Sequence, residues 1–530
     1  MTASAPSTAT VARLEQLVAQ QAQQRAARLA IIDGDRRVDY QQFNADITRC
    51  AAFLKSSTAA SARIAILARN CYEFVVLLYA IPAAGRIAVP LNTRLAAAEW
   101  REQLQRINAS VVCGEPDLLA QLDGHDTVDA TPLPIDAILD PWPVAMPVTT
   151  SARDDAGSLE DIAWILFTSG TTGRPKAVML SHSNLLAGLR SADQGRPVQD
   201  GDCYLYPFPL FHIAAHNVLH QHRHGATVVL MPGFDSKALL ALVAREQVTT
   251  VSLAPTMMSM LLDDQDFDPD LLQSLRSIGY GASAIDQSLL TRILGTLDCA
   301  LSQGYGMTEL AGSVAFLDHN QHLAALGEQP ELLNAVGKVV TGVELQLRDD
   351  EGAVIAQAVD GRPVNLADST PVATAQGEIW IRAEQVCSGF WDTENDADDQ
   401  WLATGDVGRF DDAGNLYIVD RKKDIIISGG ENVASREVEQ QLAKLAGVQL
   451  CAVVGLPDPR WGEAVYAMVQ ARQALDAQAL RERLRSQLAG FKVPKAIEFG
   501  TLPVNASGKI DKAAVRRILA TRLGIDITRD

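Results

Sequence analysis

Residues 167–182 read Phe167-Thr-Ser-Gly-Thr-Thr-Gly-Arg-Pro-Lys-Ala-Val-Met-Leu-Ser-His182. The apolar run Ile162–Phe167 that leads into them is typical of a buried strand. A loop of hydroxyl side chains and glycines follows and ends at Lys176. Glycines let a backbone approach an anion closely, and a lysine adds a positive charge. The pattern predicts a phosphate-binding loop, although not a Walker A loop, because Arg174 and Pro175 follow Gly173.

Composition restricts the class of protein. The chain has 530 residues, of which 47% are hydrophobic and 21% charged, which is typical of a globular protein of two to four domains. A formal charge of -18 argues against nucleic acid or an anionic membrane as the main partner. Seven cysteines without a C-x-x-C pair favour reduced thiols in a cytoplasmic protein. Neither a signal peptide nor an integral membrane segment is expected.

The pattern of apolar runs around the loop predicts an α/β fold. Arg63–Leu67 and Ile87–Pro90 are expected strands, and the segment Glu73–Ala83 between them is an expected helix. This alternation favours parallel strands joined by crossover helices. The same alternation returns after the loop, with expected strands at Ala226–Met231 and Val248–Leu253.

The pattern changes after Gly337. Alternating apolar residues at Val343–Arg348 and Gly377–Arg382 predict an antiparallel, barrel-like unit. The Pro-, Asp- and Thr-rich segment Asp360–Gln376 between them is expected to be a mobile loop. A charged break at Arg421–Asp424 then precedes a small module of strands and helices.

Four histidines follow one another at four-residue steps: His212, His216, His220 and His224. On a single helix they would lie near one face and could bind zinc. The segment lacks the glutamate of H-E-x-x-H and any nearby cysteine or carboxylate. We therefore expect His212 to belong to the functional site and the other three to be partly exposed helix residues.

Several short motifs together resemble the adenylate-forming (ANL) superfamily, which includes acyl-CoA synthetases, firefly luciferase and the adenylation domains of peptide synthetases. The likeness extends over roughly residues 20–518, with the motifs in the family's order. The motifs are Phe167–His182, Tyr280–Ser283, Gln303–Glu309, Thr404–Asp406, Asp420–Arg421 and Ser507–Lys509.

This resemblance implies an α/β fold with two domains. The large N-terminal domain, residues 1–420, would hold two α/β sheets and the β-barrel-like unit. Residues 421–424 would form a hinge. Residues 425–530 would form a small, mobile α+β domain that carries the catalytic lysine.

The resemblance also implies an ATP site. The β- and γ-phosphates would be bound by Thr168, Ser169, Gly170, Thr171, Thr172, Gly173 and Lys176. The nucleotide would otherwise be bound by Gly281, Ala282, Gln303, Gly304, Tyr305, Thr308, Asp406 and Arg421. Among these, Thr308 would donate to the α-phosphate and Asp406 would accept hydrogen bonds from the ribose.

Three residues are the expected catalytic groups. Lys509 would bridge the substrate carboxylate and the α-phosphate, where negative charge accumulates. Glu309 would be the magnesium ligand, since carboxylate oxygens suit Mg²⁺. His212 would lie beside the substrate carboxylate or control its entry.

A second half-reaction with coenzyme A is also implied. Lys423 occupies the hinge position of the family, and the small domain would rotate there after adenylation. Gly429 and Gly430 would then line a tunnel for the pantetheine arm of coenzyme A.

The acid and its acceptor remain open at this point. Amino-acid-activating relatives have an aspartate where this chain has His212, which favours a small-molecule organic acid without an ammonium group. The small residues Gly279, Gly281 and Gly306 leave room for a hydrophobic acid, either a medium- or long-chain fatty acid or an aryl acid. The alternatives to a CoA ligase are an enzyme that loads a carrier protein and a non-catalytic nucleotide-binding module. A homodimer is compatible with the sequence.

Overall fold

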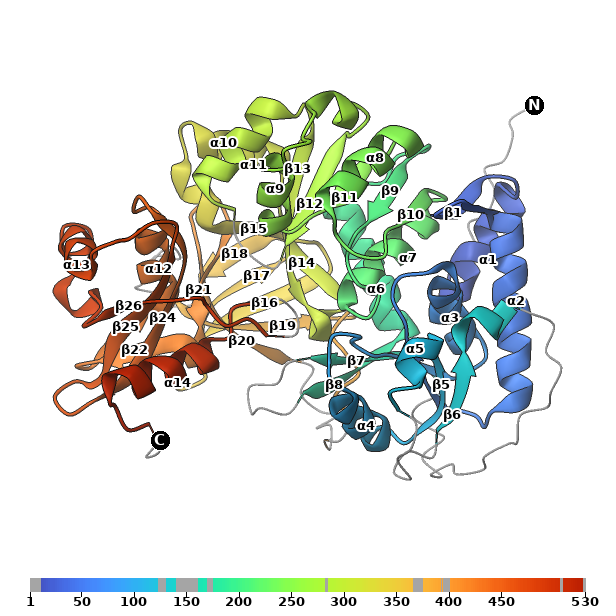
Figure 1. Cartoon of the computed structure of the whole chain (residues 1–530), viewed down its shortest axis with the longest axis horizontal. Helices are drawn as coiled ribbons and strands as arrows, with labels where there is room; N and C mark the ends of the chain where they lie inside the picture. Colours follow the sequence, from blue (N-terminus) through green and yellow to red (C-terminus); the bar gives the residue numbers. More distant parts are fainter. Residues whose placement is uncertain are drawn as a thin grey trace. The chain divides into compact units, whose positions relative to one another are not determined.

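The computed structural model describes residues 11–122, 130–139, 161–168, 175–281, 285–365, 375–391, 393, 401–505 and 509–527 (Figure 1). These residues form two compact units. The first covers residues 1–344, 359–362 and 382–401, and the second covers 345–358, 363–381 and 402–530. The hinge expected at Arg421–Asp424 falls inside the second unit, so the division at this point stays a prediction.

The first unit contains a large, mostly parallel sheet. Its strands in spatial order are β2 (Arg36–Asp39), β1 (Leu29–Asp33), β10 (Thr227–Leu230), β9 (Cys203–Tyr206), β11 (Thr250–Ser252), β12 (Ser277–Gly281), β13 (Ala300–Met307), β14 (Gly312–Leu317) and β15 (Ala335–Val339). All pairs from β1 to β13 are parallel, and β14 and β15 are antiparallel additions. The parallel order confirms the α/β prediction.

A second sheet of this unit carries the strand that begins the phosphate-loop motif. Its order is β6 (Thr131–Pro134), β5 (Ala109–Gly114), β3 (Arg63–Leu67), β4 (Ile87–Pro90), β7 (Ile162–Thr168) and β8 (Lys176–Ser181). The pairs from β6 to β7 are parallel, whereas β7 and β8 are antiparallel. Two α/β sheets were expected, and both are present.

Helices of the first unit cover these sheets (Figure 1). Helix α3 is apolar on all sides, and its residues Tyr72–Pro82 are almost wholly buried, as expected for a crossover helix. Helix α6 begins where the motif ends, because the Ser181 hydroxyl accepts from the Asn184 N–H at 3.1 Å as an N-cap. The helices are α1 (Leu14–Gln24), α2 (Tyr40–Ser57), α3 (Tyr72–Ala83), α4 (Ala97–Arg106), α5 (Pro116–Leu119), α6 (His182–Gly195), α7 (His216–Arg223), α8 (Ser236–Glu246), α9 (Pro255–Leu262), α10 (Gln287–Thr296) and α11 (His319–Leu326).

The second unit is built from two further sheets. The first has the order β18 (Arg362–Asn365), β17 (Val354–Val359), β16 (Val343–Arg348), β19 (Gly377–Ala383), β20 (Leu402–Phe410) and β21 (Leu416–Arg421). It alternates buried and half-buried residues, as the sequence predicted for β16 and β19. The expected loop at Asp360–Gln376 is only partly a loop, because β18 occupies its first residues, and residues 366–374 lie outside the described ones.

The second sheet of this unit belongs to the C-terminal module. Strand β26 (Ile497–Phe499) pairs with β25, and the remaining order is β23 (Glu431–Ala434), β22 (Ile425–Ser428), β25 (Gly462–Ala471) and β24 (Val448–Asp458). Helices α12 (Ser435–Ala443), α13 (Ala477–Arg485) and α14 (Lys512–Leu523) accompany it. Two separate apolar clusters form its core, one with α12 and α13 and one with α14. An α+β module was expected here and is present.

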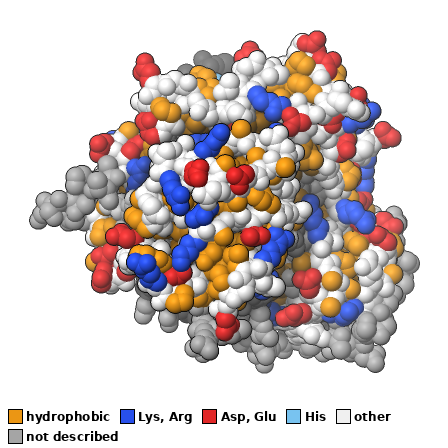
Figure 2. Space-filling view, turned by 60° about the vertical axis from the view of Figure 1, so that its left-hand side comes forward, with side chains coloured by type: hydrophobic (Ala, Val, Ile, Leu, Met, Phe, Trp, Pro, Cys, Tyr) orange, Lys and Arg blue, Asp and Glu red, His pale blue; other side chains and the backbone are white. Residues whose placement is uncertain are grey.

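Three further features concern the surface, the cysteines and the helices. Acidic and basic side chains are interspersed with apolar ones on the face shown in Figure 2. All seven cysteines are free. Among the described residues, no helix combines the length and apolar character needed to cross a membrane.

Three buried histidines, His182, His216 and His222, make stability depend on pH. Burial lowers the pKa of each from 6.5 to about 3. The cause is desolvation of the ring, which at His222 outweighs the hydrogen bond from Nε2 to the Ala30 carbonyl. The His222 Nδ1 lies 2.9 Å from the Tyr79 hydroxyl oxygen.

We expect the free energy of unfolding to fall as the pH decreases below about 6.5. The unfolded chain binds protons at these rings from that pH downward, whereas the folded chain does not until about pH 3. Each ring should lower the free energy of unfolding by about 2 kcal/mol between pH 7.5 and 5. Urea unfolding at the two pH values measures this loss.

His222→Gln should reduce the loss, whereas the control His319→Gln on α11 should leave it unchanged. A stability that does not differ between pH 7.5 and 5 would contradict the neutral, buried state of these rings.

Candidate active site

The phosphate-loop motif connects two paired strands. Thr168 at the end of β7 and Lys176 at the start of β8 are direct partners in the antiparallel register. The residues Ser169, Gly170, Thr171, Thr172 and Gly173 between them lie outside the described residues. The Lys176 ammonium lies 4.8 Å from the centre of the Phe390 ring. The two described ends of the motif are thus adjacent, as a phosphate-binding loop requires.

A short segment, residues 387–391, connects Glu309 to this loop. Its backbone pairs with β8, through the bonds from Ser388 N–H to Met179 O and from Met179 N–H to Gly389 O, both 2.9 Å. The N–H of Cys387 donates to the backbone oxygen of Glu309 at 2.8 Å. Burial raises the pKa of the Cys387 thiol to about 11, with Glu309 raising it further and Lys176 lowering it. Both charges therefore lie close to Cys387, which places the expected magnesium ligand near the expected phosphate lysine.

The expected nucleotide motif lies at the end of β13. Gln303, Gly304 and Tyr305 belong to the strand, and Thr308 and Glu309 form a single 3-10 turn directly after it. On the neighbouring strand, Gly281 is the register partner of Gly304. A Cβ on Gly281 would lie 2.9 Å from the Gly304 oxygen, so this strand contact requires glycine. The structure brings these residues together, whereas Ala282 lies outside the described residues.

His212 lies apart from the other three histidines of its pattern. It precedes the 3-10 turn Ile213–Ala215 with an extended backbone, and its ring packs against Phe211 at 4.6 Å between centres. Helix α7 begins only at His216. The four histidines therefore do not share one helix face, because the chain turns between His212 and the helix.

The expectation that the other histidines are partly exposed is wrong for His216 and His220, which are buried. A carboxylate is also present, since the Nε2 atoms of His220 and His224 lie 2.9 and 2.6 Å from Asp193 Oδ1. Asp193 lies on α6, and helix packing rather than sequence proximity brings it there. These three side chains offer ligand atoms within 4.8 Å of one another. Hydrogen bonds to the shared Asp193 carboxylate explain the positions of both imidazole rings.

The second unit brings together the residues expected at the ribose. Asp406 on β20 is the register partner of Arg421 on β21, and Oδ1 lies 2.6 Å from the arginine Nε. Asp406 is only 2% exposed. The Thr404 hydroxyl accepts from the Asp406 N–H at 3.1 Å and donates to the Ile379 oxygen. This carboxylate is therefore held rigidly in one position.

Lys509 shares the surroundings of this pair. The pKa of Lys509 is lowered first by desolvation of its ammonium and then by the charge of Arg421, whereas Asp406 raises it. Asn505 fixes the backbone, because its side-chain oxygen accepts from the Lys509 N–H at 3.0 Å and its N–H donates to the Lys509 oxygen at 2.8 Å. The expected catalytic lysine and the expected ribose ligand thus lie in one electrostatic environment.

Asp420, directly before the expected hinge, is hydrogen-bonded to the start of helix α12, which follows the hinge. Asp420 on β21 accepts from the Ser435 hydroxyl at 2.7 Å and from the Arg436 N–H at 3.2 Å, both at the start of α12. Lys423 is exposed and makes no hydrogen bond or ion pair with the described part of the chain.

The backbone conformation at positions 429 and 430 itself favours glycine. They form the two-residue turn between β22 and β23, with φ of +64° and +85°. Two consecutive positive φ values are typical of the type I′ turn, which favours glycine. A Cβ on Gly429 would also lie 2.7 Å from the Trp461 ring. Their tunnel role stays a prediction.

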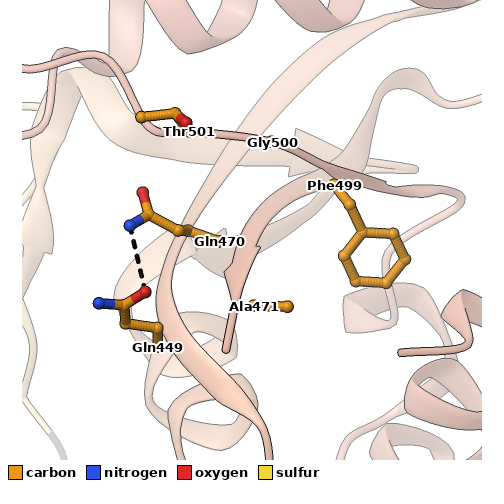
Figure 3. A pocket seen from close by; sticks show the side chains of 6 residues that line it. All are labelled: Gln449, Gln470, Ala471, Phe499, Gly500 and Thr501. Atoms are coloured by element: carbon orange, nitrogen blue, oxygen red, sulfur yellow. Dashed lines mark hydrogen bonds between the residues drawn. The ribbon is translucent and has the colours of Figure 1, made fainter. Parts of the chain in front are cut away.

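A pocket elsewhere in the second unit contains none of the expected residues (Figure 3). Gln470 donates to Gln449 at 3.2 Å across it. Its lining has no charged side chain and consists of Gln449, Gln470, Ala471, Phe499, Gly500 and Thr501.

Comparisons with known proteins agree with this arrangement. The family model described as "AMP-binding enzyme" matches residues 18–391, and "AMP-binding enzyme C-terminal domain" matches residues 437–509. A feruloyl-CoA synthase of Amycolatopsis sp is 34% identical, over 92% of this chain and 95% of that protein. The long-chain-fatty-acid–CoA ligase FadD13 of Mycobacterium tuberculosis is 31% identical, over 91% and 93%.

A solved relative supports the fold at full length. It is the o-succinylbenzoate CoA synthetase of Bacillus subtilis in complex with ATP and magnesium, with a TM-score of 0.79 and 27% identity over 94% of this chain and 98% of that one. The same enzyme with its acyl-adenylate intermediate gives a TM-score of 0.78 and 28% identity over 95% and 97%. The resemblance stated from the motifs is confirmed, and the chain belongs to the AMP-binding enzyme family.

Proposed function

We propose that the protein is an AMP-forming acid–CoA ligase. It converts a carboxylic acid and ATP into an acyl-adenylate and pyrophosphate, and then transfers the acyl group to the thiol of coenzyme A with release of AMP. The observation that carries this proposal is the Asp406–Arg421 ion pair, whose two charges both act on the Lys509 ammonium. The named activities of the feruloyl and fatty-acid relatives support it.

The first unit would bind the phosphates and the adenine. Thr168, Lys176 and the loop between them would hold the β- and γ-phosphates, and Thr308 would donate to the α-phosphate. The half-buried Glu309 carboxylate offers the oxygen ligand that magnesium prefers, and the metal would neutralise phosphate charge there. Gly281, Ala282, Gln303, Gly304 and Tyr305 would surround the adenine.

Asp406, Arg421 and Lys509 would bind the ribose and complete the catalytic groups. The fixed carboxylate of Asp406 accepts from the ribose hydroxyls, and Arg421 adds a donor. Lys509 neutralises the charge that develops as the carboxylate oxygen attacks the α-phosphorus. His212 would lie beside the substrate carboxylate or control its entry.

The thioester step needs a different arrangement of the chain. We propose that residues 1–420 form the adenylation domain and that residues 425–530 rotate about 421–424, with Lys423 at the hinge. Gly429 and Gly430 would line the pantetheine tunnel after this rotation. A homodimer and a cytoplasmic location are further expectations.

A panel of carboxylic acids tests the proposal. Fatty and aryl acids are incubated singly with ATP, magnesium and coenzyme A, and both pyrophosphate release and thioester mass are measured. We expect acid-dependent pyrophosphate release together with an acyl-CoA. Acyl-adenylate without acyl-CoA would favour a carrier-protein acceptor, and no pyrophosphate with any acid would refute the ligase.

A further inference from the structure

An arginine inside the first unit has no charged partner. Arg196 follows helix α6, and its Nη2 donates to the backbone oxygens of Tyr280 and, at 3.2 Å, Ser302. Its Nε is buried without a hydrogen-bond partner. No carboxylate of the described residues lies within 4.0 Å of this guanidinium. Burial lowers the pKa of Arg196, yet an arginine stays protonated in proteins.

The side chain of Arg196 is half-buried, and its buried Nε lacks an acceptor. A guanidinium offers five N–H donors, of which two backbone oxygens use only part. The ring of Phe316 lies 5.7 Å away and supplies only a weak contact with the cation. The remaining donor capacity fits an oxygen group that the protein itself does not provide.

The guanidinium lies over Gly279, which the sequence assigned to the acid, and over Gly304, which it assigned to the nucleotide. Gly279 and Gly281 alternate on β12, and Gly304 and Gly306 alternate on β13, so each pair shares one face of its strand. A Cβ on Gly279 would lie 2.9 Å from the Arg196 Cζ. This face has space for the arginine only because it lacks side chains.

A serine joins the arginine at the same place. A Cβ on Gly304 would lie 2.5 Å from the Ser313 hydroxyl and 3.2 Å from the Arg196 Nη2. The two polar groups, one after α6 and one on β14, therefore converge at Gly304. A charged donor and a hydroxyl together suit an oxygen acceptor.

The position along the strand fixes a length. Gly304 precedes Thr308, the expected α-phosphate ligand, by four residues. At about 3.3 Å per residue this is roughly 13 Å or less. An acid whose reacting carboxylate lies near Thr308 would place its far end at Arg196 and Ser313.

We propose that the acid substrate carries a second oxygen acceptor at the end remote from the reacting carboxylate, bound by Arg196 and Ser313. A terminal carboxylate or carbonyl has this chemistry, and a plain fatty acid lacks it. The inference rests on the proposed ligase function and narrows the hydrophobic acid expected from the sequence to one with a polar group at its far end.

Matched acids test the proposal. Straight-chain and aryl acids are compared with counterparts that carry a terminal carboxylate or a terminal keto group, with ATP–pyrophosphate exchange as the readout. The wild type should favour the oxygenated member in kcat/KM by about tenfold to a hundredfold, as expected for hydrogen bonds to a charged group. The carboxylate and keto arms identify which oxygen group is preferred.

Variants distinguish recognition from a structural role. Arg196→Met should abolish or reverse this preference with the KM for ATP unchanged, and Arg196→Lys should keep part of it. The control Arg190→Met removes an exposed arginine of helix α6, which ends just before Arg196, and should change nothing. If Arg196→Met fails to fold, Ser313→Ala should still reduce the preference severalfold.

Two results would overturn the inference. One is a wild type that prefers the plain acids, and the other is an Arg196→Met variant with an unaltered preference. In both cases the ligase function would survive. Absence of exchange with every acid would instead refute the ligase function.

Discussion

Lys509→Ala is expected to lower the rate of acyl-adenylate formation by about 10²–10³-fold, the range found when one fixed donor to a developing negative charge is removed. Arg421 is a poor substitute for the lysine, because it is already paired with Asp406 at 2.6 Å. Acid-dependent pyrophosphate release measures the effect.

The second half-reaction distinguishes a role of Lys509 in adenylation from a general loss of activity. Thioester formation from a supplied acyl-adenylate and coenzyme A should be nearly unchanged in Lys509→Ala, because that step does not need charge neutralisation at the α-phosphate. Lys444→Ala is a matched control, since this exposed lysine at the end of α12 contacts only Gln441 among the described residues. An equal loss of both half-reactions would contradict the role assigned to Lys509.

The local parts of the fold could be predicted because their causes are local. The strand Ile162–Phe167, the hairpin around Gly34 and the crossover helix α3 each follow from periodicity and turn residues within about ten positions. The pairing of Asp406 with Arg421 also follows from a short hairpin. The motifs of the site lie on these elements.

Contacts between distant segments could not be predicted in this way. Asp193 meets His220 and His224 only because α6 and α7 pack together, so counting nearby carboxylates in the sequence missed it. Arg196 belongs to no motif, and its burial over Gly279 and Gly304 depends on how α6 meets β12 and β13. In the sequence Arg196 stands among polar residues, between Gly195 and Pro197, so no local signal marks it.

The glycines show a second limit of sequence motifs. Gly429 and Gly430 match a family motif, yet their positive φ angles and the closeness of Trp461 already require glycine there. Both a tunnel for pantetheine and a tight turn would require glycine at these two positions. Substitution of these glycines would therefore report on folding before function, and it cannot test the tunnel.

Glu309→Gln is expected to lower kcat/KM for ATP by about 10²-fold and to raise the magnesium concentration needed for half-maximal rate. The amide has the same shape but lacks the negative charge that a hard cation prefers, and metal neutralisation of phosphate charge is worth several kcal/mol. The bond from Cys387 N–H goes to the backbone oxygen of Glu309, so the substitution leaves the turn intact. Initial rates of pyrophosphate release against free magnesium at fixed ATP measure both effects.

The control for this prediction is Glu331→Gln, an exposed glutamate in the 3-10 turn Pro330–Asn334, which should behave as the wild type. The shift in the magnesium requirement is the informative quantity, because a loss of rate alone could follow from any disturbance near β13. A variant that loses activity but keeps the wild-type magnesium titration would show that Glu309 acts on the substrate or on Lys176 rather than on the metal.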